Sequence, residues 1–125
     1  MRFRHFVCVS MLVGCASAPK SPGHDRNLLT RDEISSVSGA TNIYDVIRRL
    51  RSEYLTDRGR TSLLNQGDTR PTVFMDEQEF GPIESLRNIQ PDAVQSVQFY
   101  TSSMAVAKFG SRYGAGVIQI RMRGT

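Results

Sequence analysis

The apolar residues of this chain change their spacing along the sequence, and each spacing predicts a different element. From Asn42 to Leu55, apolar side chains recur every three or four positions, which is the period of a helix with one buried face. Thr41 or Asn42 can cap the start of this helix. The positions that form the predicted buried face are Ile43, Val46, Ile47, Leu50 and Tyr54.

Later segments show the patterns of strands. Thr72 to Asp76 is a short, continuous apolar run, typical of a strand that is buried on both faces. Val94 to Thr101 predicts a second strand, and Thr30 to Ile34 predicts a weaker one. Gly116 to Arg123 alternates and predicts a half-buried strand, with Ile118, Ile120 and Met122 on one face and Gln119, Arg121 and Arg123 on the other.

Two further helices are expected between these strands. The first begins near Pro82, carries apolar residues at helical spacing, and stops at Pro91. The second is short, begins at a cap provided by Ser102 or Ser103, and ends at Gly110. The resulting order predicts an α+β (α/β-type) domain in which two to three helices pack on a small mixed sheet of about four strands.

Residues 1–14 do not fit this domain. Arg2, Arg4 and His5 form a basic start, and an apolar run follows from Phe6 to Val13. This is the layout of a secretory leader. The run is too short to cross a bilayer, which takes about 20 apolar residues.

The residues at the end of the leader, Leu12-Val13-Gly14-Cys15, resemble the lipobox of bacterial lipoproteins. The resemblance implies cleavage before Cys15 and a membrane anchor of acyl chains, such as palmitate, on that cysteine. Two or three chains make a durable anchor, whereas one binds only marginally. Ala16 stands where an Asp would retain such a protein, which implies export to the outer membrane. The alternative is an ordinary secreted protein.

The mature chain then has two parts. Residues 15–29 are small and polar and include two prolines, so they predict a flexible tether after the lipidated cysteine. Residues 30–125 are expected to form the single domain, with its first apolar residues near Leu28. Leu63 and Leu64 are expected to hold a polar loop against the body of this domain.

Charge excludes one class of partner. The chain of 125 residues has a net charge of +4, which falls to +2 once Arg2 and Arg4 leave with the leader. Arginines at positions 48, 49 and 51 lie on the predicted helix beside Asp45 and Glu53, as on a solvated helix face. A nucleic-acid-binding protein would gather its basic residues on one surface, so we expect no nucleic-acid partner.

Candidate chemistry inside the domain is sparse. The one histidine beyond the leader, His24, lies in the predicted tether, and Cys15 is expected to be acylated. Acid–base or nucleophilic catalysis that depends on these residue types is therefore not expected, and neither is a cofactor. The carboxylates Asp32-Glu33, Asp76-Glu77 and Glu79 could hold a hard cation or act as a glycosidase pair. Solvated loop acids are the favoured interpretation, so we expect no metal and no enzyme.

Three segments resemble the plug domain of TonB-dependent outer-membrane receptors. They are Thr41 to Leu50, Pro71 to Asp76, and the C-terminal run formed by Ala93–Tyr100, Ala105–Arg112 and Gly114–Ile120. The last is the most specific, because plug domains carry a valine-rich strand, a small-residue helix that ends in aromatic-Gly, and a glycine turn into a Gly-Val-Ile strand. The resemblance covers about residues 28–124 and implies a plug-like fold.

The glycines of that run are expected to act on the backbone. Gly110 can end a helix in the left-handed conformation, and Gly114 and Gly116 can let the chain reverse before the last strand. They do not fit a dinucleotide-binding fingerprint, because their spacing differs and they precede a strand where that fingerprint follows one.

The chain also departs from the receptor pattern. A receptor continues into a barrel of about 22 strands, whereas this sequence ends at Arg123-Gly124-Thr125. The tether shows no TonB box, and Asp76-Glu77-Gln78 stands where plugs usually carry Asp-Gly. We therefore expect a plug-like domain that does not transport a substrate by itself.

Two classes of function remain. One is a non-catalytic interaction module that docks on an outer-membrane receptor or a periplasmic protein, on either face of the membrane. Tyr100 and Tyr113, flanked by serine and glycine, are the candidate contact residues. The other is a small-solute-binding lipoprotein. A concave apolar pocket would favour the solute-binding protein, and a flat surface or a free strand edge would favour the module.

Overall fold

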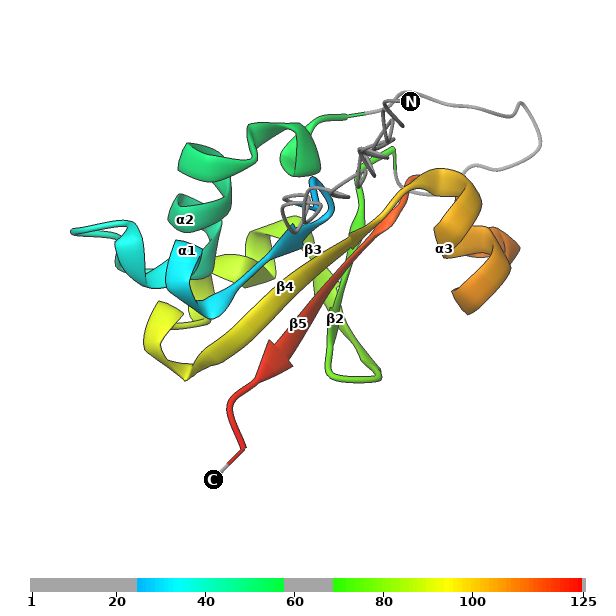
Figure 1. Cartoon of the computed structure of the whole chain (residues 1–125). Coiled ribbons are helices and arrows are strands. Elements are labelled where there is room, and N and C mark those ends of the chain that lie inside the picture. Colours follow the sequence, from blue (N-terminus) through cyan, green and yellow to red (C-terminus); the bar gives the residue numbers. More distant parts are fainter. Residues whose placement is uncertain (1–24, 58–68, 125) are drawn as a thin grey trace, which may run out of the picture.

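The computed structural model describes residues 25–57 and 69–124 (Figure 1). The predicted leader, Cys15 and most of the predicted tether lie outside these residues. Leu63 and Leu64 lie outside them as well.

A mixed five-stranded sheet forms the centre of the described fold, with strand order β1-β4-β5-β2-β3. Strands β2 and β5 are parallel, and the other neighbours are antiparallel. The predicted α+β class is confirmed, with one strand more than expected. The strands are β1 (Leu28–Leu29), β2 (Thr72–Met75), β3 (Gln78–Pro82), β4 (Val94–Tyr100) and β5 (Val117–Met122).

Helices cover both faces of this sheet (Figure 1). α1 (Arg31–Ser36) and α2 (Ile43–Leu50) pack on one face, and α3 (Ser102–Phe109) packs on the other. Short 3-10 helices complete the described chain: η1 (Ser52–Leu55), η2 (Ile83–Asn88), η3 (Pro91–Ala93) and η4 (Ser111–Tyr113).

The main core lies between the sheet and the α1–α2 layer. Side chains of α2 meet alternate residues of the strands, because successive strand residues point to opposite faces. Burial of this apolar surface is the principal stabilising force in the domain. The core includes Ile34, Ile43, Val46, Ile47, Tyr54, Val73, Val97, Phe99, Ile118 and Ile120.

The helix predicted from Asn42 to Leu55 is divided into two parts. Of the two predicted caps, Thr41 and Asn42, Asn42 caps α2, with its side-chain oxygen accepting from the Asp45 amide at 2.9 Å. α2 then ends at Leu50, because Arg51 takes a non-helical conformation with φ −148° and ψ 59°. The 3-10 helix η1 continues the turn and still buries Tyr54.

The strand predicted from Thr30 to Ile34 is wrong. Thr30 caps α1, and Glu33 completes a reciprocal capping box that satisfies backbone amides at the helix start. The first strand is instead β1, whose Leu29 is fully buried. Because β1 lies within residues 15–29, the ordered domain begins inside the segment predicted as a tether.

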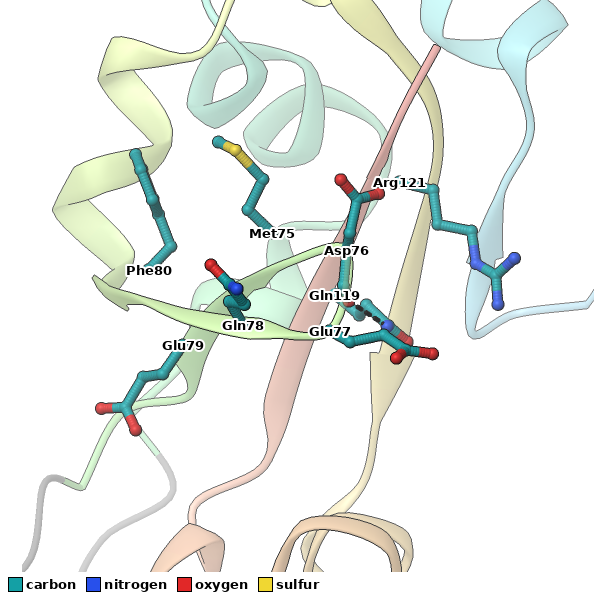
Figure 2. Close-up of a pocket in the computed structure, with 8 residues that line it drawn as sticks. All are labelled: Met75, Asp76, Glu77, Gln78, Glu79, Phe80, Gln119 and Arg121. Carbon is teal, nitrogen blue, oxygen red and sulfur yellow. Dashed lines mark hydrogen bonds between the residues drawn. The ribbon is translucent and has the colours of Figure 1, made fainter. Parts of the chain in front are cut away.

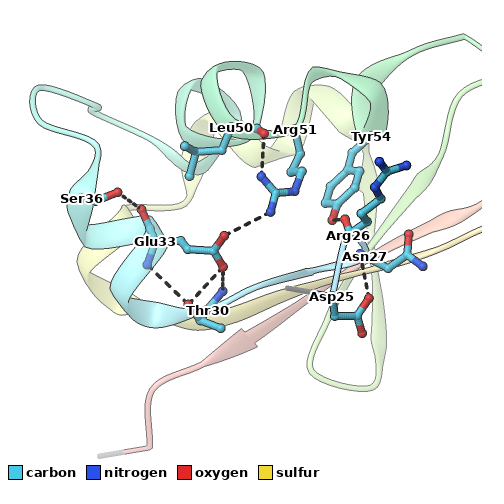
Figure 3. A network of polar contacts seen from close by, with 9 residues as sticks. All are labelled: Asp25, Arg26, Asn27, Thr30, Glu33, Ser36, Leu50, Arg51 and Tyr54. Carbon is cyan, nitrogen blue, oxygen red and sulfur yellow. Dashed lines mark hydrogen bonds and ion pairs between the residues drawn. The ribbon is translucent and has the colours of Figure 1, made fainter. Parts of the chain in front are cut away.

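A polar network attaches this N-terminal segment to α2 and η1 (Figure 3). Glu33 pairs with Arg51 at 3.1 Å, and both side chains are largely buried. The Tyr54 hydroxyl donates to the Arg26 carbonyl, and its ring stacks on Phe99 with centroids 4.6 Å apart. Burial raises the pKa of Tyr54 to about 12, so the hydroxyl remains a donor at neutral pH.

Strand β3 is an element that the sequence pattern did not predict. Its residues are mostly exposed and show no apolar alternation. Pro82 is the last residue of the strand and also the N-cap of the 3-10 helix η2. Ile83, Leu86 and Ile89 are spaced by three residues, and the chain forms the 3-10 helix η2, whose period is three residues. The predicted α-helix here is therefore corrected to a 3-10 helix.

Strand β5 is more deeply buried than predicted. Gln119 was placed on a solvated face, but only 2% of it is exposed. The face that it shares with Val117 is covered by α3 and by the β2–β3 hairpin. The cap of α3 also differs from the prediction, because Thr101 and not Ser102 or Ser103 occupies the cap position, without a side-chain hydrogen bond.

The three glycines of the C-terminal run have different backbone conformations. Gly110 ends α3 with φ +111°, and Gly116 precedes β5 with φ +101°, both in the region that favours glycine. Gly114 is in the right-handed helical region with φ −62°, a conformation that other residues adopt as readily as glycine. At Gly116, a Cβ atom would also lie 2.9 Å from the Tyr100 carbonyl oxygen.

Replacement of Gly116 by alanine is therefore expected to destabilise the domain by about 1–3 kcal/mol. The matched change Gly114→Ala should leave the stability equal or slightly higher, because alanine adopts φ −62° without strain. Urea unfolding of both variants measures this difference. Equal effects of the two substitutions would contradict the assigned turn geometry.

Candidate functional site

The α3 face of the sheet carries a small aromatic cluster. The Phe109 ring lies 5.2 Å from the Tyr100 ring, 6.1 Å from the Tyr113 ring and 4.6 Å from the Phe74 ring. Tyr100 and Tyr113, the candidate contact residues, therefore lie close together around Phe109. Both are half-buried, so only part of each ring is available for contact.

The two tyrosine hydroxyls are held by neighbouring side chains. The Tyr100 hydroxyl donates to Gln119 Oε1 at 3.0 Å and accepts from Lys108 Nζ at 2.6 Å. The Tyr113 hydroxyl donates to Glu79 Oε2 at 2.6 Å, and this hydrogen bond raises the pKa of Tyr113. Both hydroxyls are therefore oriented by the fold.

Gln119 joins three elements from its buried position on β5. Its Nε2 donates to the Asp76 carbonyl in the β2–β3 hairpin. Its Oε1 accepts from Tyr100 of β4 and, at 3.4 Å, from Lys108 of α3. Because every polar group of this amide is occupied, burial leaves none of its hydrogen bonds unmade. Gln119 thereby positions the hairpin against the sheet.

An open pocket of about 660 Å³ lies beside the β2–β3 hairpin (Figure 2). Figure 2 shows Met75, Gln78 and Phe80 on one side of the hairpin and Glu79 on the other. The lining is largely polar and charged, and consists of Met75, Asp76, Glu77, Gln78, Glu79, Phe80, Gln119 and Arg121.

A smaller pocket of about 280 Å³ lies near the end of β3, on the side of Tyr113. Its lining includes Glu79 and Gly81 from β3 and Arg112 and Tyr113 from η4. Glu79 therefore borders both pockets. The strand and its flanking hollows make one continuous surface, which we call the β3 surface and define as residues 76–82.

The hairpin turn at positions 76 and 77 needs no glycine. Asp76 has φ +54°, a region that aspartate adopts more readily than most side chains. Among the described non-glycine residues, Asp76 alone has a positive φ, so Glu77 does not need a glycine-like conformation. Asp76 Oδ1 also accepts from the Met122 amide at 3.2 Å, which fixes the turn to the end of β5.

The candidate carboxylates do not form one centre. Glu33 belongs to the α1 cap, Glu79 contacts Tyr113 and lies 3.6 Å from Arg112, and Asp76 holds the hairpin turn. Over residues 25–57 and 69–124, no three histidine, cysteine, aspartate or glutamate side chains are placed to hold a metal ion. No helix of the same residues is long and apolar enough to cross a bilayer.

Strand β3 has a free edge that sequence reasoning missed. Its one neighbour among the described strands is β2, so its other edge faces away from the sheet. Phe80 on this strand is 44% exposed, one of the most exposed large apolar side chains in the described chain. The polar, proline-ended sequence of β3 lacks the apolar alternation by which strands are recognised.

Comparison with protein-family models, curated proteins and solved structures finds no match to this chain. The likeness to TonB-dependent receptor plug domains therefore stays a prediction from the sequence. The described residues form a small α+β domain in which strand β3 has a free edge.

Gln119→Leu should lower the free energy of unfolding by about 1–3 kcal/mol, because it leaves the Tyr100 hydroxyl without its acceptor and the Asp76 carbonyl without its donor. Gln98 is the matched control, since it pairs with Gln119 across β4 and β5 but is only half-buried. Gln98→Leu should lower the free energy of unfolding by less than about 1 kcal/mol. Urea unfolding tests the pair, and a larger loss for Gln98→Leu would contradict the assigned role of Gln119.

Proposed function

We propose that this protein is a lipoprotein of the outer membrane whose domain acts as a non-catalytic interaction module. Acyl chains on Cys15 hold it at the membrane, and the β3 surface binds an extended segment of another envelope protein. A receptor barrel or an assembly partner of a transport system would suit the plug-like character of the sequence.

The free edge of β3 is the observation that carries this proposal. An edge strand presents backbone N–H and C=O groups that have no neighbouring strand. Such an edge can accept an added strand from a partner, with backbone hydrogen bonds for affinity and side-chain contacts for specificity. Exposed Phe80 provides an apolar contact on the same strand.

The solute-binding alternative is less well supported. The larger pocket has a volume of about 660 Å³, which is within the usual range for small ligands. Its lining, however, holds three carboxylates, two glutamines and an arginine beside Met75 and Phe80. Ligand pockets are mostly apolar with few polar groups, so this lining fits a surface groove better than a solute site.

The proposed anchor keeps the domain close to the membrane. Nine residues lie between Cys15 and the first described residue, Asp25, so a fully extended chain would place these two at most about 35 Å apart. A partner embedded in the same membrane would then meet the β3 surface at a high effective concentration. At a high effective concentration, even a strand-edge contact of low affinity would be occupied.

Lipidation is tested by replacing Cys15 with serine. The unchanged chain should lose residues 1–14, carry acyl chains on Cys15 and fractionate with the outer membrane, as shown by mass spectrometry and density-gradient separation. Cys15→Ser should leave the chain uncleaved at this site and without diacylglycerol. A Cys15→Ser protein that is still processed before residue 15 and bound to the membrane would refute the lipid anchor.

The interaction module is tested by placing a photoreactive phenylalanine analogue at Phe80 or at Met104. The two side chains are 44% and 42% exposed, so they are matched in exposure but lie on β3 and α3 respectively. Illumination of native membranes should give a discrete protein adduct from position 80 and none from position 104. Equal adducts from both positions, or no protein adduct from position 80, would contradict the module.

A further inference from the structure

The chemistry of the β3 surface restricts what its partner can be. We infer that the partner segment is an extended strand in which apolar and basic side chains alternate. This inference rests on the proposed function, because it specifies the occupant of the same strand edge. It follows from the direction of the side chains, from their charge, and from the effect of that charge on self-pairing.

The segment that pairs with β3 must alternate between two kinds of side chain. A strand that pairs with β3 points successive side chains to opposite faces of the sheet. On one face it meets Phe80 and Gln78, which lie with Met75 on the same side of the hairpin (Figure 2). On the other face it meets Glu79. Apolar side chains suit the face with exposed Phe80, and a cation suits the face with Glu79.

Charge favours lysine or arginine at the polar positions. The lining of the larger pocket holds the carboxylates of Asp76, Glu77 and Glu79 and one guanidinium, that of Arg121. Glu77 forms no hydrogen bond or ion pair with any residue that the structure describes, so its charge is available to a partner. The contact between Glu79 and Arg112 is 3.6 Å long and solvent-exposed, and such pairs contribute little. Three carboxylates therefore stand against two guanidinium groups, those of Arg121 and Arg112, and the surface carries a small excess of negative charge.

The same charge disfavours a second copy of this chain as the occupant. Pairing of two β3 strands would bring the acidic residues Glu77 and Glu79 of both copies to one shared edge. Like charges across neighbouring strands are destabilising. Pro82 also lacks an N–H group, which shortens the ladder that two β3 strands could form. A basic segment from a different protein avoids the charge repulsion.

Three synthetic peptides test this inference against the purified full chain. Each has eight residues with valine at alternate positions, and lysine, serine or glutamate at the positions between. Titration calorimetry should show that the lysine peptide binds about tenfold or more tightly than the glutamate peptide, with the serine peptide between them. Amide hydrogen exchange should slow in residues 78–82 when the lysine peptide is bound.

Two charge reversals locate the binding. Glu77→Lys should weaken the binding of the lysine peptide about fivefold at low salt, because an attraction between unlike charges becomes a repulsion between like charges. Glu53→Lys is the matched control, since Glu53 is also exposed but lies in η1, which packs on the main core with α2. This variant should change the affinity by less than about twofold. Thermal unfolding confirms that both variants remain folded.

Each other outcome has a distinct meaning. Equal binding of the three peptides, with slowed exchange in β3, would overturn the basic partner and leave the interaction module in place. No slowing of exchange in β3 by any peptide would count against the interaction module as well. Equal weakening by Glu77→Lys and Glu53→Lys would show general attraction to the chain and overturn the inference. Self-association that protects β3 would make a second copy the occupant and overturn it too.

Discussion

Burial of β5 on both faces is the constraint on which the rest of the structure depends. Val117, Ile118, Gln119 and Ile120 are all buried, so each face of this strand must be covered by other elements. α1 and α2 cover one face with aliphatic side chains, whereas the other face contains a glutamine. Gln119 can be buried there only because Tyr100, Lys108 and the Asp76 carbonyl together satisfy its amide. The same hydrogen bonds hold the β2–β3 hairpin and α3 in place.

The unequal cover of the two faces explains why the candidate surface lies where it does. α3 is short and contributes Ala105 and half-buried Phe109, so it covers only the part of its face near Tyr100 and Tyr113. The hairpin beyond it remains open, with β3 at the edge of the sheet. An edge that presents polar backbone, one exposed aromatic ring and several carboxylates suits reversible contact with another chain better than enclosure of a small molecule. Membrane anchoring would compensate for the modest area of such a contact.

Most of the core could be predicted from the sequence, whereas the candidate surface could not. Ile43, Val46 and Ile47 follow helical spacing, and all three are buried on one face of α2. Gln119 alternates with isoleucines in the pattern of a solvated residue, and only the packing of α3 and the hairpin shows that it is buried. β3 has neither alternation nor β-branched residues, because an edge strand with exposed side chains needs neither. Tyr100 and Tyr113 were identified from local neighbours, but their common contact with Phe109 depends on the fold.

The sequence by itself determined the α+β class, the start and buried face of α2 with a cap at Thr41 or Asn42, and the strands β2, β4 and β5. Each of these depends on periodicity or on contacts within a few residues. Thr30 and Glu33 stand at the spacing of a capping box, although the apolar pattern of Thr30 to Ile34 predicts a strand. The tertiary structure alone decided which of the three C-terminal glycines takes a positive φ, that Gln119 is buried, and that β3 lies at the edge of the sheet. These features arise from contacts between residues far apart in the chain, and local sequence patterns do not record which distant elements will meet.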